Sequence, residues 1–291
     1  MSQVEHFLIH PAQFKLDGGA MYGIIPKPLW DKKHPADEFN RVELALRLWC
    51  IKTKNKLIIT DTGIGDYHGE KFDQQFDVRG GVHPLKQVLA QAGYQLEDVT
   101  DLVISHLHFD HAGGICTQDN GNFIPVFPNA TLHLHKRHHD YSLDPFDKDR
   151  GSFHHKVYTP AVEYYAQKNM IHWLDDEKGN ILKDEGYELN FVVSHGHTPF
   201  LVHPYDDKYI YLADIVPTSN HIHVPWVMAY DIEPARSTED KKRILSMVAE
   251  KDLTVIFEHD PLYWGAKITT ENPKKIAASE RFEANNKFQK I

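Results

Sequence analysis

The chain has 291 residues, of which 41% are hydrophobic and 25% charged, a composition typical of a globular protein with a large core. Its net charge of −9 repels phosphate backbones and makes nucleic acid an unfavourable partner. No run of about 18 apolar residues could span a membrane, the N-terminal stretch lacks signal-peptide features, and two cysteines form no disulfide framework. We therefore expect a soluble, cytoplasmic protein whose partner is a small-molecule substrate.

The first third of the chain predicts three strands and one helix. Residues 42–53 alternate between apolar and polar side chains, as a half-buried strand does, and an apolar run at 57–60 predicts a second strand that ends at Asp61. Residues 84–92 place apolar side chains at helical spacing, with a proline at the start and a glycine just past the end. A further apolar run predicts a strand at 102–105.

The rest of the chain is predicted to continue the same single domain, residues 1–291. The middle, about 115–185, is irregular and rich in histidine, aspartate and aromatic residues, and we expect a helical cap or insert there. Apolar periodicity predicts a helix that is capped by Ser237 or Thr238. Short strands are predicted at 189–194, 200–203, 209–212 and 253–257.

Five of the predicted strands end in side chains that commonly bind metals. Loops at strand ends are held by a rigid sheet and often carry functional residues, so we expect these ends to meet at one edge. The residues at these ends are Asp61, His106, His195 with His197, Asp214, and His259.

The segment after strand 102–105 reads HLHFDH and holds three histidines and one aspartate in six residues. His106 and His108 point the same way on extended backbone and can bind one ion, whereas Asp110 and His111 follow a turn and can face a second. Imidazole and carboxylate suit Zn, and also Fe, Mn or Co. Two coordination spheres need further ligands, and the other strand ends supply His197, Asp214 and His259.

These motifs resemble those of the metallo-β-lactamase superfamily. HLHFDH matches its His-x-His-x-Asp-His motif, and Gly-His-Thr-Pro at 196–199, YLAD at 211–214, FEHD at 257–260 and Asp-Thr-Gly at 61–63 match its other motifs. The likeness runs from about 42 to 260. It implies an α/β (α+β) fold, the four-layer αββα sandwich, with the metal site at one edge.

The resemblance also implies a ligand set for two divalent metal ions. It places His106, His108 and His197 on the first ion, Asp110, His111 and His259 on the second, Asp214 between them, and Asp61 behind a ligand histidine. His195 competes with His197 within SHGHTP, and the family's Gly-His-Thr favours His197. Other histidines, His138 among them, are expected to be solvated or structural.

Hydrolysis is the chemistry that such a centre favours. Two ions can share a hydroxide that attacks the substrate, and Asp110 can help to move a proton. The apparent bridge Asp214 argues against zinc β-lactamases, which lack it, and the acidic chain argues against RNA as substrate. A lactone or ester is therefore the first expectation; the alternatives are a phosphotriester or aryl ester hydrolase and a metal-binding protein without turnover.

Within the superfamily, the chain is similar to quorum-quenching acyl-homoserine lactonases and to the methyl parathion hydrolase-like branch. The similarity lies in HLHFDHAGG, in DGGAMYGIIPKPLW at 17–30 and in PWVMAYD at 225–231, although apolar stretches of this kind also pack in cores or homodimers. We expect an apolar wall for an acyl or aryl group, formed by Met21, Tyr22, Phe109, Trp226 and Met228.

The chain departs from the lactonases at two positions. Pro217 stands where one lactonase type has a tyrosine that donates a hydrogen bond to the substrate, so we expect His221 to be the donor instead. Phe200 stands where family members often have glycine after His-Thr-Pro.

Overall fold

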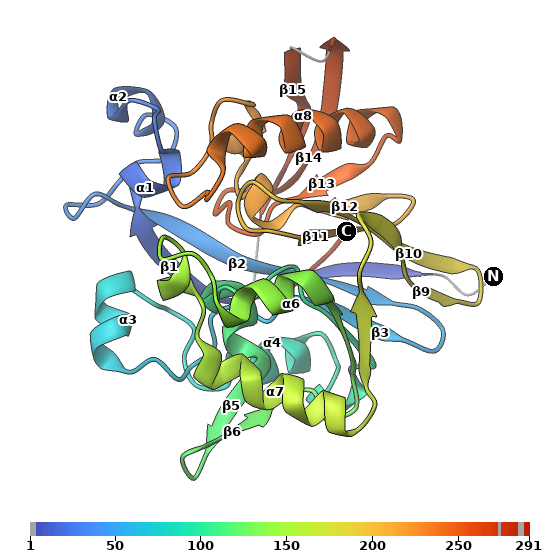
Figure 1. Cartoon of the computed structure of the whole chain (residues 1–291). Helices are drawn as coiled ribbons and strands as arrows, with labels where there is room; N and C mark the ends of the chain where they lie inside the picture. The colour runs from blue at the N-terminus through green and yellow to red at the C-terminus, as the bar shows by residue number, and fades with distance from the viewer. Residues whose placement is uncertain (1–3, 273–274, 285–287) are drawn as a thin grey trace.

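Two seven-stranded sheets form the centre of the computed structural model, which describes residues 4–272, 275–284 and 288–291 (Figure 1). The first has the order β16 (Phe288–Lys290), β1 (Glu5–Asp17), β2 (Arg41–Lys52), β3 (Leu57–Thr60), β4 (Asp101–Val103), β7 (Thr131–His135), β8 (Ile171–Leu174). The second has the order β15 (Lys275–Glu283), β14 (Tyr263–Asn272), β13 (Thr254–Ile256), β12 (Tyr209–Tyr211), β11 (Leu201–Tyr205), β10 (Tyr187–Ser194), β9 (Lys178–Asp184).

Helices cover the outer faces of both sheets, and short ones lie in the loops. The α-helices are α1 (Gly18–Tyr22), α2 (Lys27–Trp30), α3 (Glu70–Phe76), α4 (Pro84–Gln91), α5 (Phe109–Ala112), α6 (Lys136–Leu143), α7 (His155–Gln167) and α8 (Pro234–Glu250). The 3-10 helices are η1 (Leu96–Asp98), η2 (Gly113–Ile115), η3 (Arg150–Ser152), η4 (Ala213–Ile215) and η5 (Ser219–Ile222), and β5 (Cys116–Asp119) pairs with β6 (Asn122–Pro125).

The alternating side chains of β2 show how the layers form. Trp49 and Ile51 lie in the apolar core between the sheets, whereas Leu48 and Cys50 face the core beneath α4 and α7. A third core lies between the second sheet and α8. Figure 1 shows α8 on one side of the sheets and α4 and α7 on the other. The predicted four-layer αββα architecture is therefore confirmed.

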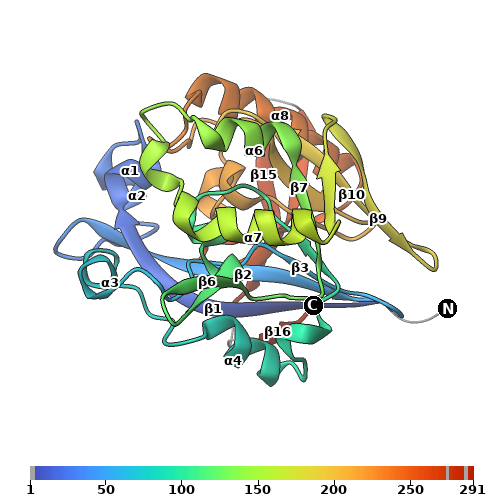
Figure 2. The same cartoon turned by 60° about the horizontal axis from the view of Figure 1, so that its bottom comes forward.

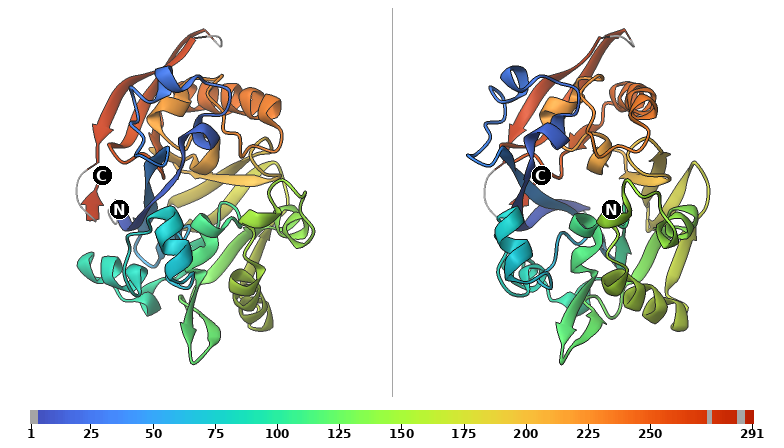
Figure 3. Two further views of the ribbon diagram at one scale, coloured as in Figure 1. Left: turned by 90° about the vertical axis from the view of Figure 1, so that its left-hand side faces the viewer. Right: turned by 60° about the vertical axis from the view of Figure 1, so that its left-hand side comes forward.

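The ends of the described chain meet within the first sheet. Strand β16 pairs with β1, and Figure 2 shows the two side by side. Figure 3 shows α1 and α2 (blue) at the same end of the molecule as the β14–β15 hairpin (red) and α8 (orange). No helix within the described residues is long and apolar enough to cross a membrane.

Two sequence predictions are wrong in detail. Helix α8 begins at Pro234, whose fixed φ suits the first helical position, so Ser237 and Thr238 lie inside the helix and cap nothing. The expected cap at 115–185 contains α6 and α7, but its strands β7, β8 and β9 belong to the two main sheets. This region is therefore part of the sandwich and not a separate insert.

Candidate metal centre

The ligand-type residues come from separate elements and meet at one edge of the sandwich. The loop after β4 carries His106 and His108, and α5 carries Asp110 and His111 directly behind them. The second sheet supplies the other three, from the loops after β10 and β13 and from η4, namely His197, His259 and Asp214.

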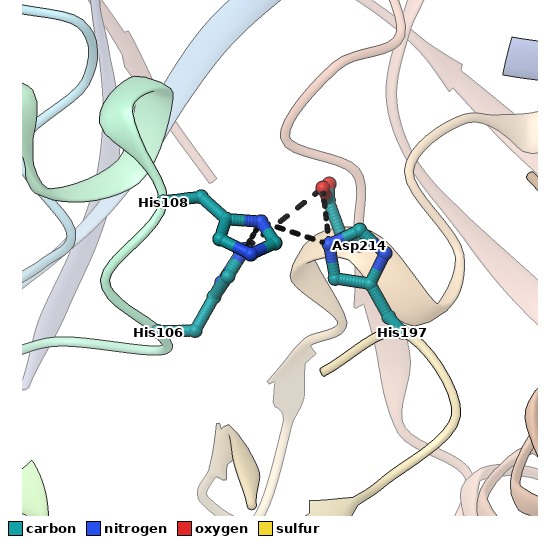
Figure 4. A group of neighbouring side chains, drawn as sticks. All are labelled: His106, His108, His197 and Asp214. Atoms are coloured by element: carbon teal, nitrogen blue, oxygen red, sulfur yellow. Dashed lines mark hydrogen bonds and ion pairs between the residues drawn. The ribbon is translucent and has the colours of Figure 1, made fainter. Parts of the chain in front are cut away.

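The first group consists of His106, His108, His197 and Asp214, and Figure 4 shows their side chains pointing toward one another. The Nδ1 atom of His108 lies 3.1 Å from His106 Nε2 and 3.2 Å from His197 Nε2. The Oδ2 atom of Asp214 lies 3.1 Å from His197 Nε2 and 4.0 Å from His106 Nε2. Three imidazole nitrogens and one carboxylate oxygen thus face a common point.

The second group consists of Asp110, His111 and His259, and it shares Asp214 with the first. The Nε2 atom of His259 lies 3.6 Å from Asp110 Oδ2 and 3.0 Å from Asp214 Oδ1. The Nε2 atom of His111 lies 3.8 Å from Asp110 Oδ2 and 3.5 Å from Asp214 Oδ2. Asp214 therefore lies between the two groups, the position that a bridging ligand would occupy.

The far nitrogens of the histidines are held by outer partners. His197 Nδ1 lies 3.0 Å from Asp231 Oδ1, and His259 Nδ1 lies 2.8 Å from the carbonyl oxygen of Ala45. A carbonyl oxygen only accepts, so His259 Nδ1 carries the proton and Nε2 is left free to bind a cation. Such contacts fix the tautomer and the ring orientation of metal ligands.

Two carboxylates hold His111 from behind. Its Nδ1 atom lies 3.1 Å from Asp61 Oδ2 and 2.9 Å from Glu258 Oε2. Asp61 also accepts hydrogen bonds from the backbone nitrogen and hydroxyl of Ser105, at 2.7 and 2.6 Å. Asp61 therefore lies where an orienting role behind a ligand histidine requires it.

The buried polar atoms of the centre fit divalent cations. Within the described residues, His111 Nε2, His259 Nε2 and Asp214 Oδ1 are buried without a hydrogen bond, which is costly unless another group satisfies them. Burial alone would raise the pKa of Asp214, but the imidazoles around it, led by His111, hold it well below its usual range. Burial alone would lower the pKa of His197 and His259, but Asp214 raises both to about 9. An ionised carboxylate among imidazoles is a donor set that takes up metal in exchange for protons.

His195 lies outside the centre. Its Nε2 atom lies 2.9 Å from Glu177 Oε2, on the outer side of the loop, whereas His197 faces the cluster. The geometry therefore favours His197 as the ligand of the SHGHTP segment.

The hydrogen bonds of His221 contradict its expected role as a donor to the substrate. Its Nε2–H donates to the carbonyl oxygen of Met21 at 2.9 Å, and its Nδ1 accepts from the Thr218 hydroxyl at 2.8 Å. Burial lowers the pKa of the ring to about 3, so it stays neutral, and no N–H remains for a substrate.

The five residues of the expected apolar wall lie in one cluster, and Phe14 of this cluster packs against the ring of His259 with a centroid distance of 5.8 Å. Met21, Tyr22 and Met228 are buried inside it, whereas Phe109 and Trp226 are half-buried. Direct contact with a substrate would therefore fall to Phe109 and Trp226, with the other three packed behind them.

Sequence reasoning missed several residues that hold the ligands. Glu258 lies in FEHD and Asp231 in PWVMAYD, both of which the sequence analysis singled out. Only Glu258 had a signal in the sequence, because it directly precedes the ligand His259. Asp149, whose Oδ2 lies 3.9 Å from His108 Nε2, comes from a region without a recognisable motif. His138, from the same region, was expected to be solvated or structural, but its place beside the ligand loops could not be predicted.

Comparison with known proteins agrees with this geometry. The model of the metallo-beta-lactamase superfamily matches residues 48–259, which include every proposed metal ligand. The chain therefore belongs to the metallo-beta-lactamase superfamily.

Curated relatives of the chain include N-acyl homoserine lactonases. The lactonase AttM of Agrobacterium fabrum is 27% identical over 274 residues, which cover 88% of this chain and 89% of the relative. A lactonase of Bacillus thuringiensis is 33% identical over 233 residues, which cover 75% of this chain and 82% of the relative.

Solved structures share the fold. A probable metal-dependent hydrolase from Staphylococcus aureus superposes with a TM-score of 0.83 at 24% identity, covering 98% of this chain and 99% of that chain. AidC, a dizinc quorum-quenching lactonase, superposes with a TM-score of 0.72 at 22% identity, covering 96% of this chain and 94% of that chain. The chain is thus a hydrolase of this superfamily, with lactonases among its relatives.

Proposed function

We propose that the chain is a dinuclear metal-dependent lactonase and that N-acyl homoserine lactones are its first candidate substrates. The observation that carries the proposal is the shared carboxylate of Asp214, whose two oxygens lie 3.1 Å from His197 Nε2 and 3.0 Å from His259 Nε2. The names of the curated relatives support the choice of a lactone.

The chain's own residues would bind the ions and move a proton. Two divalent ions, with zinc as the first candidate, would polarise the carbonyl group of the substrate and activate a water molecule near neutral pH. The Oδ2 atom of Asp110 lies 3.6 Å from His259 Nε2, within the second ligand group. Its carboxylate would take the proton that the water loses. The new C–O bond would then form at the carbonyl carbon, the ring C–O bond would break, and Asp110 would return the proton to the leaving oxygen to give a hydroxy acid.

The substrate also needs a hydrogen-bond donor, and we propose Tyr230. Tyr230 is half-buried in the apolar cluster with Met228. Burial and nearby carboxylates, Asp110 and Asp214 among them, keep the pKa of its hydroxyl above the usual range, so it retains its proton. Tyr230→Phe should lower kcat/KM by about 100-fold, as loss of a donor to a developing oxyanion does, with metal content unchanged. Unchanged kcat/KM in this variant would remove Tyr230 from the mechanism.

A substrate panel tests the proposed function. Purified protein loaded with zinc would be assayed on homoserine lactones with acyl tails of increasing length, on aryl esters and on phosphotriesters, with Asp214→Ala as the inactive control. We expect ring opening that becomes faster with tail length, since each methylene buried against Phe109 and Trp226 contributes up to about 0.8 kcal/mol. Fast cleavage of aryl esters or phosphotriesters without any lactone turnover would refute the lactonase and leave a hydrolase of another ester.

A further inference from the structure

His138, on α6, connects the two loops that carry the three histidines of the first ligand group. We call residues 105–111 the first ligand loop and residues 195–200 the second ligand loop. The backbone N–H of Leu107 donates to His138 Nε2 at 2.8 Å. On the other side of the ring, His138 Nδ1 lies 2.8 Å from the carbonyl oxygen of Pro199. One imidazole thus spans two loops that come from different sheets.

The protonation of this ring follows from its partners. The carbonyl oxygen of Pro199 only accepts, so Nδ1 of His138 carries the proton, and Nε2 accepts from Leu107. The side chain is fully buried, with 0% of it exposed, and burial lowers its pKa to about 3. His138 is therefore a neutral ring with one donor and one acceptor, both used.

The two hydrogen bonds end next to the three histidines of the first group, and the first ligand loop also carries Asp110 and His111 of the second group. Leu107 lies between His106 and His108, and Pro199 is two residues beyond His197. The Nε2 atoms of His106 and His197 lie 3.1 and 3.2 Å from His108 Nδ1. The second ligand loop carries no residue of the group formed by Asp110, His111 and His259. A change in the spacing of the loops would therefore change the first group more than the second.

We propose that His138 is a positioning residue that fixes the distance between the two ligand loops and thereby sets the metal affinity of the first group. The inference rests on the proposed metal centre but concerns a residue that touches neither metal nor substrate. Loss of the ring leaves the buried N–H of Leu107 without an acceptor, which is unfavourable, and the loops can relieve this cost only by moving.

Cobalt binding tests the inference, because Co²⁺ reports both affinity and ligand geometry through its visible absorption. The variants are His138→Leu, which removes both hydrogen bonds, and His138→Gln, whose amide keeps one donor and one acceptor. His133→Leu is the matched control, since His133 is also buried and its ring bonds Asp101 at 2.9 Å and His172 at 3.0 Å, outside both ligand loops. Each change would be repeated in the His259→Ala background, which retains the first group alone.

We expect His138→Leu to weaken Co²⁺ binding at the first group by about 10- to 100-fold, as loss of an outer partner does, and to alter its absorption spectrum. Binding at the second group should change less than about twofold, and His138→Gln should recover most of the affinity. His133→Leu should lower the melting temperature of the metal-free protein without a change in Co²⁺ affinity.

Two results would overturn the inference while the proposed function stands. One is an unchanged first-group affinity and spectrum in His138→Leu. The other is an equal loss of affinity in His133→Leu, which would reveal a general effect of destabilisation. If His138→Leu does not fold, His138→Asn replaces it, because the shorter amide stays polar but cannot reach both loops. Wild-type melting with weakened first-group affinity in His138→Asn then supports positioning, and an unchanged first-group affinity contradicts it. Failure of the wild-type protein to bind two Co²⁺ ions would instead refute the dinuclear centre itself.

Discussion

Gly196 and Ser237 lie in such close contact that a β-carbon on Gly196 would be 2.2 Å from the backbone nitrogen of Ser237. Ser237 belongs to the first turns of α8, and the backbone just before this helix donates to the Gly196 carbonyl, from Glu233 at 2.9 Å. The start of α8 thus lies directly against the loop that presents His197. Glycine is required at 196 because of this close approach. The contact with α8 therefore explains why a glycine precedes His197 in the Gly-His-Thr motif.

Gly196→Ala should therefore displace either α8 or His197. We expect a loss of about 1–3 kcal/mol in the free energy of unfolding, as overpacking in a core produces, together with weaker metal binding. Urea unfolding and metal titration measure the two effects. Gly151→Ala is the control, because nothing lies within 4 Å of the added carbon at that position. Wild-type stability and metal content in Gly196→Ala would contradict the packing argument.

The two histidines of SHGHTP can be separated by their metal content. His197→Ala removes an imidazole that faces the cluster, so the variant should lose one ion and most activity. His195→Ala removes a ring that contacts Glu177 at 2.9 Å on the outer side, so both ions should remain. Elemental analysis of both variants, prepared side by side without chelator, is the measurement. Loss of metal confined to His195→Ala would reverse the assignment.

Asp214→Ala should affect both ions at once. Its two oxygens lie 3.0 Å from His259 Nε2 and 3.1 Å from His197 Nε2, so removal takes a ligand from each group. We expect the metal content to fall from two ions per chain to fewer than one, with loss of activity, a larger effect than loss of any single terminal ligand. Asp207→Ala, at an exposed aspartate, controls for the change of residue type. Retention of both ions and most activity would show that Asp214 is not the bridge.

The elements that the sequence predicts well have uninterrupted local patterns. Strand β3 has the bounds predicted from its apolar run, 57–60, because a turn precedes it and a loop follows. Strand β1 was not predicted, because its alternation is interrupted at a bulge between Ile9 and Ala12 that contains Pro11. The ligand residues could be predicted because most of them stand in short segments just after a strand, and Asp110 and His111 share the HLHFDH motif with His106 and His108.

The groups behind the ligands could not be predicted, because they depend on contacts between loops far apart in the chain. Glu258 meets His111 across 147 positions of sequence, at 2.9 Å, and no spacing rule connects them. Similarly, His221 is a plausible donor by sequence, but only the folded chain shows that Met21 and Thr218 use both of its nitrogens.

Phe200 has a left-handed backbone, φ 58°, a conformation that glycine adopts without strain. Its ring compensates by stacking on His135 at 4.9 Å and by lying 5.3 Å from the Arg137 guanidinium. Phe200→Ala loses the ring but keeps the strain, whereas Phe200→Gly loses both. We therefore expect the glycine variant to be more stable than the alanine variant by about 0.5–1 kcal/mol, the strain relieved less the entropy cost of glycine. Urea unfolding compares the two, and the opposite order would contradict the strain.

Lys241, in α8, is a buried cation that holds the loop next to the apolar wall. Its ammonium donates to the carbonyl oxygens of His223 at 3.0 Å and Trp226 at 2.7 Å, and the side chain is only 1% exposed. Burial lowers its pKa to about 7, although Asp231 opposes the shift. A neutral amine still has two N–H groups, so both hydrogen bonds persist when the proton is lost.

This pKa predicts how stability depends on pH. In the unfolded chain the pKa of Lys241 is about 10.4. Between pH 7 and that value the unfolded state therefore binds the proton and the folded state does not. The free energy of unfolding should therefore rise with pH across this window, by up to about 1.4 kcal/mol per pH unit from this residue, and the contribution is lost as the pH falls through 7. Lys241→Met should show a flatter curve in urea unfolding at pH 7, 8 and 9, while Lys242→Met, one position along on a more exposed part of the helix, should keep the wild-type slope. Because other groups titrate alike in all three proteins, parallel curves for wild type and Lys241→Met would show that Lys241 keeps an ordinary pKa in the folded chain.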